Sequence, residues 1–256
     1  MSDKDINIAQ VSCVYNEIDI LPNQIKYIKS QGLEPYVLDN YSTDGTWQWL
    51  QENNIPSHQF DTKGTFDLEE NHKLMLMLAK NLSPKFQWVY FADADLFPVC
   101  IDFTIKEIIE LADQHDFNSI FARTFHFANT GEKGKDNIFN KYNKVNGGDR
   151  WLKIVKIKDL KKLAGDGCVM DPMDYVTRIY NNEIILFNYG NVKSLKDRQE
   201  TFERRKKAWK NGLNKNYGKA YVKNDKNNWI CDEDTLDVNT ELGPYINKLR
   251  KIILDE

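Results

Sequence analysis

Short apolar segments alternate with segments of helical periodicity through the first half of the chain. The apolar segments that predict strands lie at residues 8–14, 36–39, 58–60 and 88–92. Apolar residues at helical spacing predict helices within residues 18–28, 46–51, 66–80 and 104–112. Strands that alternate with helices through short connections favour a mostly parallel sheet with helices on both faces. The pattern therefore predicts an α/β fold.

The second half of the chain has weaker periodicity. Further strands are predicted at residues 118–128, 151–157 and 184–189, with a polar, mobile loop at 129–148. A long basic helix is predicted at residues 194–210, a flexible connection at 211–228 and a closing helix at 241–254. We therefore expect one domain at residues 1–192 and a basic, helical C-terminal extension at 193–256 that packs on it.

The net charge of −3 is unevenly distributed along the 256 residues. Residues 193–226 carry twelve Lys and Arg against four Asp and Glu. This basic segment indicates an anionic partner nearby, although a solvated surface helix would have the same composition. Nucleic acid is not the expected partner, because the isoelectric point is 5.9 and no aromatic platform accompanies the basic residues.

Cys and His are too dispersed for a zinc site. The four cysteines form no CxxC pair and the four histidines no HxxxH pair, which favours free thiols in a reducing compartment. No apolar run reaches the roughly 20 residues of a membrane helix, and the N-terminus lacks the pattern of a signal peptide. We therefore expect a cytoplasmic protein without a transmembrane segment, with peripheral binding at a membrane surface as an alternative.

Polar residues directly follow three of the predicted strands. Residues 15–17 are Tyr-Asn-Glu, residues 39–46 are Asp-Asn-Tyr-Ser-Thr-Asp-Gly-Thr, and residues 93–95 are Asp-Ala-Asp. Sheets of parallel strands bind ligands outside the carboxyl ends of the strands. The three clusters are therefore predicted to open onto one edge of the sheet and to form a single site.

Asp93 and Asp95 are the strongest candidates for a metal site. If the chain stays extended, residues two apart point to the same side, and two carboxylates that close need a shared proton or a cation. Oxygen ligands of this kind suit Mg²⁺ or Mn²⁺. The alternative is that one Asp caps a turn while the other faces solvent.

Residues of the other two clusters allow a structural and a functional interpretation. Asp39, at a strand end, is placed to accept from a ribose hydroxyl or a base N–H, or it forms a turn. Asn16 and Glu17 either contact the ligand or cap the following helix. Asp44 is interpreted as structural, as a cap of the helix that begins near Thr46.

Together these motifs resemble the family 2-like group of glycosyltransferases with the GT-A fold. In that group a strand ending in a YNE-type motif is followed by a helix, then by D-N-x-S-x-D-G-T, then by an apolar strand ending in DxD. The three clusters have this order over residues 8–100. The resemblance implies a Rossmann-like GT-A fold with a mostly parallel central sheet flanked by helices.

The resemblance also implies an activity and its residues. It implies a metal-dependent transferase that moves a sugar from a nucleotide-sugar donor, most often UDP-linked, to an acceptor hydroxyl, usually with inversion. The residues that would bind the nucleotide are Asn16, Glu17, Asp39, Asp93 and Lys193. The residues that would bind Mn²⁺ or Mg²⁺ are Asp93, Asp95 and Asn188.

The sequence departs from the pattern of the family at two positions. Many relatives read DADEF, whereas Leu96 takes the place of the Glu in this chain. Related sequences often read His-Tyr-Gly before a basic helix, with the His completing the metal site, whereas this chain has Asn188. An amide oxygen is a weaker ligand for a hard cation, so the departure lowers the expected metal affinity more than it questions the fold.

A carboxylate between the DxD and the last core strand would take the proton of the acceptor hydroxyl. The candidates are Asp149, Asp166, Asp171 and Asp174. We choose Asp171 first and then Asp174, which flank Pro172-Met173, although for each of the four acids taken singly an ordinary loop residue is the favoured interpretation. The acceptor is a carbohydrate or another hydroxyl-bearing molecule, and the many Lys and Asn residues of the second half are compatible with an anionic one.

Two other functions use similar residues. One is a non-catalytic module that binds a nucleotide-sugar or a glycan on a transferase-like fold. The other is a DxD phosphohydrolase with an aspartyl nucleophile, but those enzymes place the DxD on the first strand, and several elements precede residues 93–95.

Overall fold

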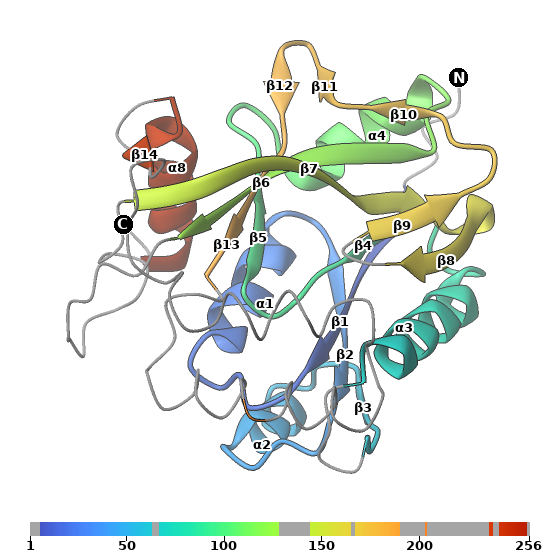
Figure 1. The fold of residues 1–256 in the computed structure, drawn as a ribbon, viewed down its shortest axis with the longest axis vertical. Helices are drawn as coiled ribbons and strands as arrows, with labels where there is room; N and C mark the ends of the chain where they lie inside the picture. Colours follow the sequence, from blue (N-terminus) through green and yellow to red (C-terminus); the bar gives the residue numbers. More distant parts are fainter. Residues whose placement is uncertain are drawn as a thin grey trace.

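The computed structural model describes residues 6–62, 67–127, 144–164, 167–189, 203, 236–237 and 241–254. One large twisted sheet runs through the molecule with helices packed against it (Figure 1). Lys193, most of the predicted basic helix and the predicted connection at 211–228 lie outside the described residues. The domain boundary expected after residue 192 therefore stays a prediction.

Four parallel strands form the first half of the sheet, in the order β3-β2-β1-β4. Their bounds are β1 Ile8–Val14, β2 Glu34–Asp39, β3 Ser57–Gln59 and β4 Trp88–Phe91. Val14 pairs with Asp39, and Val11 pairs with Phe91. The carboxyl ends of these strands therefore lie at one edge, as the sequence predicts.

The second half of the sheet is mixed, in the order β4-β7-β6-β13-β5. The bounds are β5 Leu96–Val99, β6 Ser119–Phe127, β7 Lys144–Lys156 and β13 Ile185–Asn188. β7 is antiparallel to β4 and β6 and also to the short strand β14, Leu236–Asp237. β13 is parallel to β6, and β5 is antiparallel to β13. The predicted α/β class is confirmed, although the sheet is parallel in its first half and mixed in its second.

β7 begins at Lys144, so the predicted loop is wrong for residues 144–148. Gly147 and Gly148 have φ values of +120° and +114°, which residues with side chains rarely adopt. A Cβ on Gly147 would meet the backbone oxygen of Thr124 at 2.6 Å. The glycines that suggest a loop in the sequence instead allow an irregular strand to pair closely with β6.

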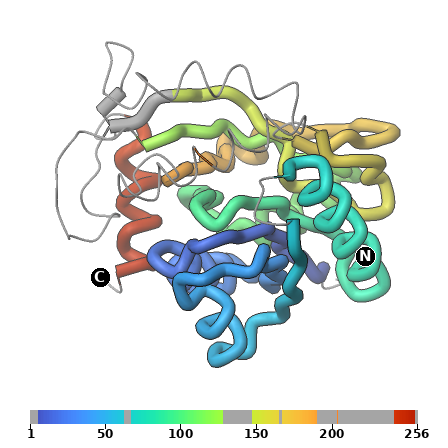
Figure 2. Tube along the Cα trace, turned by 60° about the horizontal axis from the view of Figure 1, so that its bottom comes forward, coloured from blue at the N-terminus to red at the C-terminus, as the bar shows by residue number. Residues whose placement is uncertain are grey.

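The predicted helices of the first half are all present. Their bounds are α1 Leu21–Ser30, α2 Thr46–Glu52, α3 Leu68–Leu82 and α4 Ile105–Gln114. Thr104 and Glu107 form a capping box at the start of α4. The closing helix, α8, spans Gly243–Leu254, and α8 and α3 lie at opposite flanks of the molecule (Figures 1 and 2).

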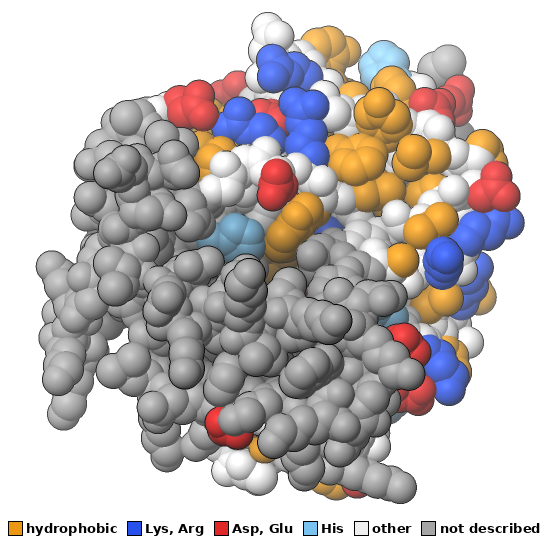
Figure 3. Space-filling model, in the orientation of Figure 1, with side chains coloured by type: hydrophobic (Ala, Val, Ile, Leu, Met, Phe, Trp, Pro, Cys, Tyr) orange, Lys and Arg blue, Asp and Glu red, His pale blue; other side chains and the backbone are white. Residues whose placement is uncertain are grey.

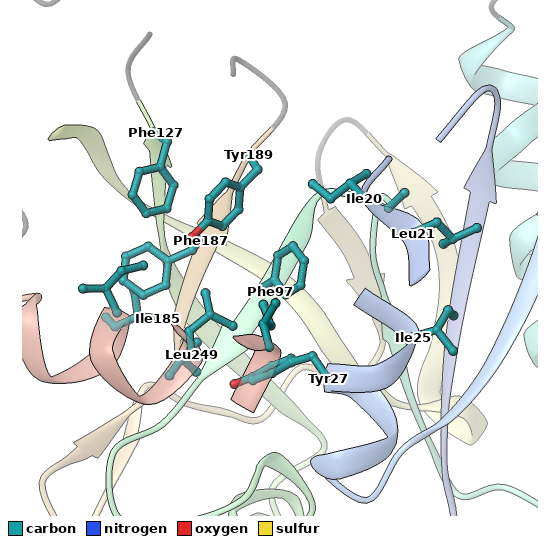
Figure 4. Packing of buried hydrophobic residues seen from close by; sticks show 14 of the residues in the cluster. Ile20, Leu21, Ile25, Tyr27, Phe97, Phe127, Ile185, Phe187, Tyr189 and Leu249 are labelled. Carbon is teal, nitrogen blue, oxygen red and sulfur yellow. The ribbon is translucent and has the colours of Figure 1, made fainter. Parts of the chain in front are cut away.

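Aromatic and aliphatic side chains fill the space between α1, α8 and the end of the sheet formed by β6, β13 and β5 (Figure 4). Tyr189 stacks on Phe127 with ring centroids 4.3 Å apart, and Phe97 packs edge-on against Tyr27 at 5.8 Å. Burial of this many large side chains is the main stabilising contribution on this side of the sheet. This packing places α8 on the same hydrophobic core as β5.

Shorter elements complete the described structure. They are η1 Ile157–Asp159, β8 Leu160–Ala164, β9 Gly167–Met170, β10 Tyr175–Val176, β11 Arg178–Ile179, β12 Asn182–Glu183 and β14 Leu236–Asp237. In Figure 3 hydrophobic side chains gather over the region of β7, β9 and β10, where Val169, Met173 and Tyr175 are exposed. Within the described residues, no helix is both long and apolar enough to cross a bilayer.

Candidate active site

The three polar clusters follow β1, β2 and β4 at the same edge of the sheet. The amide of Asn40 donates to the carbonyl of Val14, and the amide of Ala92 donates to the carbonyl of Val11. These bonds extend the ladders just beyond the strand ends. They hold Asn16, Asp39 and Asp93 at one edge, as the sequence predicts.

Hydrogen bonds join the loop after β1 to the loop after β2. The side-chain oxygen of Asn16 accepts from the amide of Thr43 at 2.8 Å, and the amide of Asn16 donates to Ser42 Oγ at 2.9 Å. The amide of Glu17 donates to Thr46 Oγ1 at 2.9 Å. Asn16 has a φ of +55°, which Asn tolerates better than most residues. The side-chain oxygen of Asn16 is thus used to shape the two loops.

Asp44 links the same two loops. Its Oδ1 accepts from the amide of Thr46 at 2.9 Å and from Thr46 Oγ1, while its Oδ2 accepts from the amide of Ile18 at 3.1 Å. The helix begins at Thr46, as predicted. These contacts agree with the structural interpretation of Asp44, but the N-cap position of the helix is Gly45 and no side chain caps it, so the expectation that Asp44 caps the helix is wrong.

The carboxylate of Asp39 is completely buried at the end of β2. Its Oδ2 accepts from the amide of Ser42 at 3.1 Å and from Gln59 Nε2 at 3.2 Å. Its Oδ1 has no hydrogen-bond partner among the described residues. A buried carboxylate oxygen without a donor is costly, so a ligand N–H or O–H that reached Oδ1 would bind favourably.

Asp93 and Asp95 lie in a turn, so the expected extended chain is wrong at this point. The amide of Leu96 donates to the carbonyl of Asp93 at 3.1 Å, which closes the turn between β4 and β5. The side chain of Asp93 is 64% exposed and Asp95 is half-buried. Burial and then the charge of Asp93 raise the pKa of Tyr90 well above its usual value, and the charge of Asp95 adds to this effect. Both carboxylates therefore lie near one buried hydroxyl.

Pairing of β13 with β5 brings Asn188 to the Asp-Ala-Asp turn. Asn188 is in register with Leu96, and the amide of Tyr189 donates to the carbonyl of Asp95 at 2.9 Å. On its other side Asn188 is in register with His126 of β6. The predicted metal residues thus belong to adjoining segments, and His126 is a neighbour that the sequence pattern does not reveal.

The oxygens at this turn fit a cation that is shared with a ligand. Among the residues that the structure describes, no group of three or more His, Cys, Asp or Glu side chains is arranged to hold a metal ion. Mg²⁺ usually takes one or two carboxylates and completes its shell with phosphate oxygens and water. Asp93 and Asp95 supply that number of carboxylates, so they fit Mg²⁺ or Mn²⁺ only together with a phosphate-bearing ligand.

A cavity of about 90 Å³ opens beside Asp93, between the carboxyl end of β4, α3 and the β8–β9 hairpin. Its lining residues are Cys13, Leu68, Asn71, His72, Met75, Phe91, Ala92, Asp93, Lys153, Leu163, Gly167 and Cys168. Lys153 Nζ lies 3.9 Å from Asp93 Oδ2. Sequence analysis does not single out Lys153, because a lysine within a strand pattern reads as a solvent-facing residue.

The structure does not bring Asp171 and Asp174 to the edge that carries Asp93. The carbonyl of Asp174 accepts from the amide of Asn118 at 3.0 Å and from Ser119 Oγ at 2.9 Å. Ser119 begins β6 and lies level with the first residues of β4, at the amino end of that strand. β10 pairs with Ser119 and Ile120 of β6 and so holds the loop at the edge opposite Asp93. This position conflicts with the expectation that Asp171 and Asp174 serve the site.

Asp149 is the base candidate that the sheet places on the correct side. It lies in β7 opposite Thr124, towards the carboxyl end of β6, and its side chain is exposed. Asp166 lies outside the described residues. The topology therefore favours Asp149 over the two residues that sequence analysis prefers.

One protein family and two solved structures are similar to this chain. The family model described as Glycosyl transferase family 2 matches residues 11–168, more than half of the chain. TarS 1-349 from S. aureus is similar in structure, with 15% identity and a TM-score of 0.46 over 78% of this chain and 63% of that one. Glucosyl-3-phosphoglycerate synthase from Mycobacterium tuberculosis, solved with phosphoglyceric acid, has 15% identity and a TM-score of 0.34 over 60% and 57%. The chain thus spans less than two thirds of either structure, and no curated protein matches its sequence.

Proposed function

The chain belongs to glycosyl transferase family 2 and has its GT-A fold, and from this premise we propose that it transfers a sugar from a nucleotide-sugar donor to an acceptor hydroxyl. One observation carries the proposal. The loops after β1 and β2 are joined by hydrogen bonds, and the Asp93–Asp95 turn follows β4 at the same edge. Such an edge is where sheets of this kind bind nucleotides.

The donor is a nucleoside diphosphate sugar, with UDP as the first choice. Asp39 Oδ1, buried and without a described donor, would accept from the nucleoside. Asn16 and Glu17 shape the loop that borders the nucleotide, mainly through their own hydrogen bonds. Lys193 stays a further candidate for the diphosphate.

Asp93 and Asp95, with Asn188 beside them, would hold Mn²⁺ or Mg²⁺ together with the donor diphosphate. When bound, the ion would stabilise the negative charge that develops on the leaving diphosphate. Asp149 would accept the proton of the attacking hydroxyl, and a single displacement of this kind inverts the anomeric carbon. The acceptor is a hydroxyl-bearing molecule, and an anionic one would match the basic residues of 193–226.

Ligand-induced stabilisation tests the donor class. The melting temperature is measured with UDP, GDP and CDP, each with and without Mn²⁺, and a rise for one nucleotide that Mn²⁺ enlarges is expected. If none of the three stabilises the protein, the proposed donor class is wrong.

A second measurement separates a transferase from its alternatives. Release of nucleoside diphosphate from the matching nucleotide-sugar is expected, because transferases slowly hydrolyse their donors. Binding without any release would instead indicate a non-catalytic module. A phosphorylated aspartate trapped after incubation with a phosphate ester would indicate a phosphohydrolase.

A further inference from the structure

Lys153 lies at an irregularity of β7 beside the candidate active site. Ile120 of β6 pairs with Ile154, but the next residue, Phe121, pairs with Leu152. Lys153 is therefore the extra residue of a β-bulge. Bulges are common next to active sites, where they redirect a single side chain. This bulge directs Lys153 to the cavity that Asp93 also lines.

The ammonium group of Lys153 is poorly compensated for a buried charge. Only 11% of its side chain is exposed, and its ion pair with Asp93 spans 3.9 Å, beyond hydrogen-bond distance. The Trp151 ring, 5.2 Å from Nζ, is its other charge-compensating contact. Within the described part of the chain, Lys153 makes no hydrogen bond through Nζ.

Lys156, on the same strand, is a buried lysine whose charge is balanced by a close ion pair. Its side chain is 12% exposed, nearly the same as that of Lys153, but its Nζ lies 2.9 Å from Asp113 Oδ1. A buried ammonium that lacks such a partner has lost hydration without gaining equivalent hydrogen bonds. The three donors of Lys153 are therefore available to an anionic group that enters the cavity.

We propose that Lys153 binds the diphosphate of the donor directly. In the ligand-free protein the carboxylate of Asp93 partly balances its charge, and in the complex phosphate oxygens take that place. The inference rests on the proposed function, because it assigns a residue to the same donor site. It adds a cation supplied by the chain itself, on the strand next to the Asp93–Asp95 turn.

The experiment compares a nucleoside diphosphate with its nucleoside. The nucleotide that stabilises the wild type most is titrated by calorimetry, in EDTA and in Mn²⁺, into the wild type and into Lys153→Met and Lys153→Gln. Lys156→Met is the matched control, because it removes an equally buried lysine from the same strand. The melting temperature of each variant reports whether it folds.

Both Lys153 variants are expected to bind the diphosphate about tenfold or more weakly, which corresponds to the loss of a charge-assisted hydrogen bond. The loss appears in EDTA as well as in Mn²⁺, while binding of the nucleoside is unchanged. The Lys156→Met variant is expected to lose stability and keep its affinity for the diphosphate.

Three results would overturn the assignment. Unchanged diphosphate affinity in a folded Lys153 variant would show that the lysine does not touch the phosphates. Equal weakening of nucleoside and diphosphate would indicate a general distortion of the site. If the wild type binds no nucleoside diphosphate at all, both this inference and the proposed donor class fail, whereas the first two results leave the donor class intact.

Discussion

The side-chain amide of Gln24 donates to the backbone carbonyl of Asp93. The same Nε2 donates to the carbonyl of Leu96 at 3.2 Å, so one buried amide spans the turn that carries both acids. Gln24 lies on α1 and is completely buried. The position of the Asp93–Asp95 turn thus depends on a helix that is distant from it in the sequence.

Replacement of Gln24 by Leu is expected to displace the turn. Two backbone carbonyls would each lose one hydrogen bond, which costs about 0.5–1.5 kcal/mol per bond, because Asp93 keeps the amide of Leu96 and Leu96 keeps the hydroxyl of Tyr90 as donors. Donor affinity should fall together with stability, because the turn carries both candidate metal ligands. Calorimetry with the donor nucleotide and thermal unfolding measure the two effects.

Gln31→Leu is the control for the Gln24 variant. Gln31 is almost as buried, and its Oε1 accepts from the amide of Ile105 at the start of α4, away from the site. This variant should lose stability and keep donor affinity. Equal donor affinity in both folded variants would contradict a positioning role of Gln24.

Asp95→Asn tests the proposed metal ligand. The amide keeps the size of the side chain and removes its charge, so the fold should persist while the benefit of Mn²⁺ for nucleotide binding is lost. Binding is measured by calorimetry with Mn²⁺ and with EDTA. The same gain from Mn²⁺ in the variant and the wild type would exclude Asp95 as a ligand.

Asp44→Ala is expected to loosen the two joined loops. The change removes the acceptors of the Thr46 and Ile18 amides at once, and each lost hydrogen bond costs about 0.5–1.5 kcal/mol. Nucleotide affinity should fall because Asn16 depends on the same loops. Thermal unfolding and nucleotide titration check both effects, and an unchanged melting temperature would show that the loops hold without Asp44.

The sequence predicts the first half of the fold because local patterns decide it. Residues 8–14 form the predicted strand without any shift of its ends, and the polar clusters meet at one edge because parallel strands require it. The resemblance ends near residue 100, whereas the family match continues to residue 168. Beyond β4 local patterns still predict α4, β6 and β13, but they do not reveal the order in which the strands pair, which departs from the order of the sequence.

The residues that sequence analysis misses owe their positions to long-range contacts. Gln24 reads as one more polar residue of a helix, and only the packing of α1 reveals its bond to Asp93. The role of Lys153 can be recognised only from the pairing register of β6 and β7, because the sequence of a single strand does not reveal a bulge. In the sequence Asp174 is one more acid of a loop, and only the pairing of β10 with β6 shows at which edge of the sheet it lies.

The candidate bases make opposite predictions. Asp149→Asn should lower the rate of transfer at saturating donor by about 100-fold or more and leave donor affinity intact, as expected for loss of a general base. Asp171→Asn and Asp174→Asn should retain the rate, because their loop lies at the other edge. Steady-state kinetics with the identified donor checks the three variants. A lower rate in Asp171→Asn alone would instead support Asp171 as the base.

Cys168 allows a test of the cavity that does not depend on any ligand. Burial raises the pKa of its thiol to about 12, and the positive charge of Lys153 acts in the opposite direction. Very little of the thiol would be ionised near neutral pH, so alkylation in the folded protein should be slow and should rise about tenfold per pH unit over the range in which the protein stays folded. Because the ammonium favours the thiolate, Lys153→Met should raise this pKa further and slow alkylation wherever the lysine of the wild type is charged. Mass spectrometry of the peptide that contains Cys168 measures the rate, with the protein unfolded in urea as the reference for a free thiol. Faster alkylation in Lys153→Met than in the wild type would show that the lysine covers the thiol rather than polarising it.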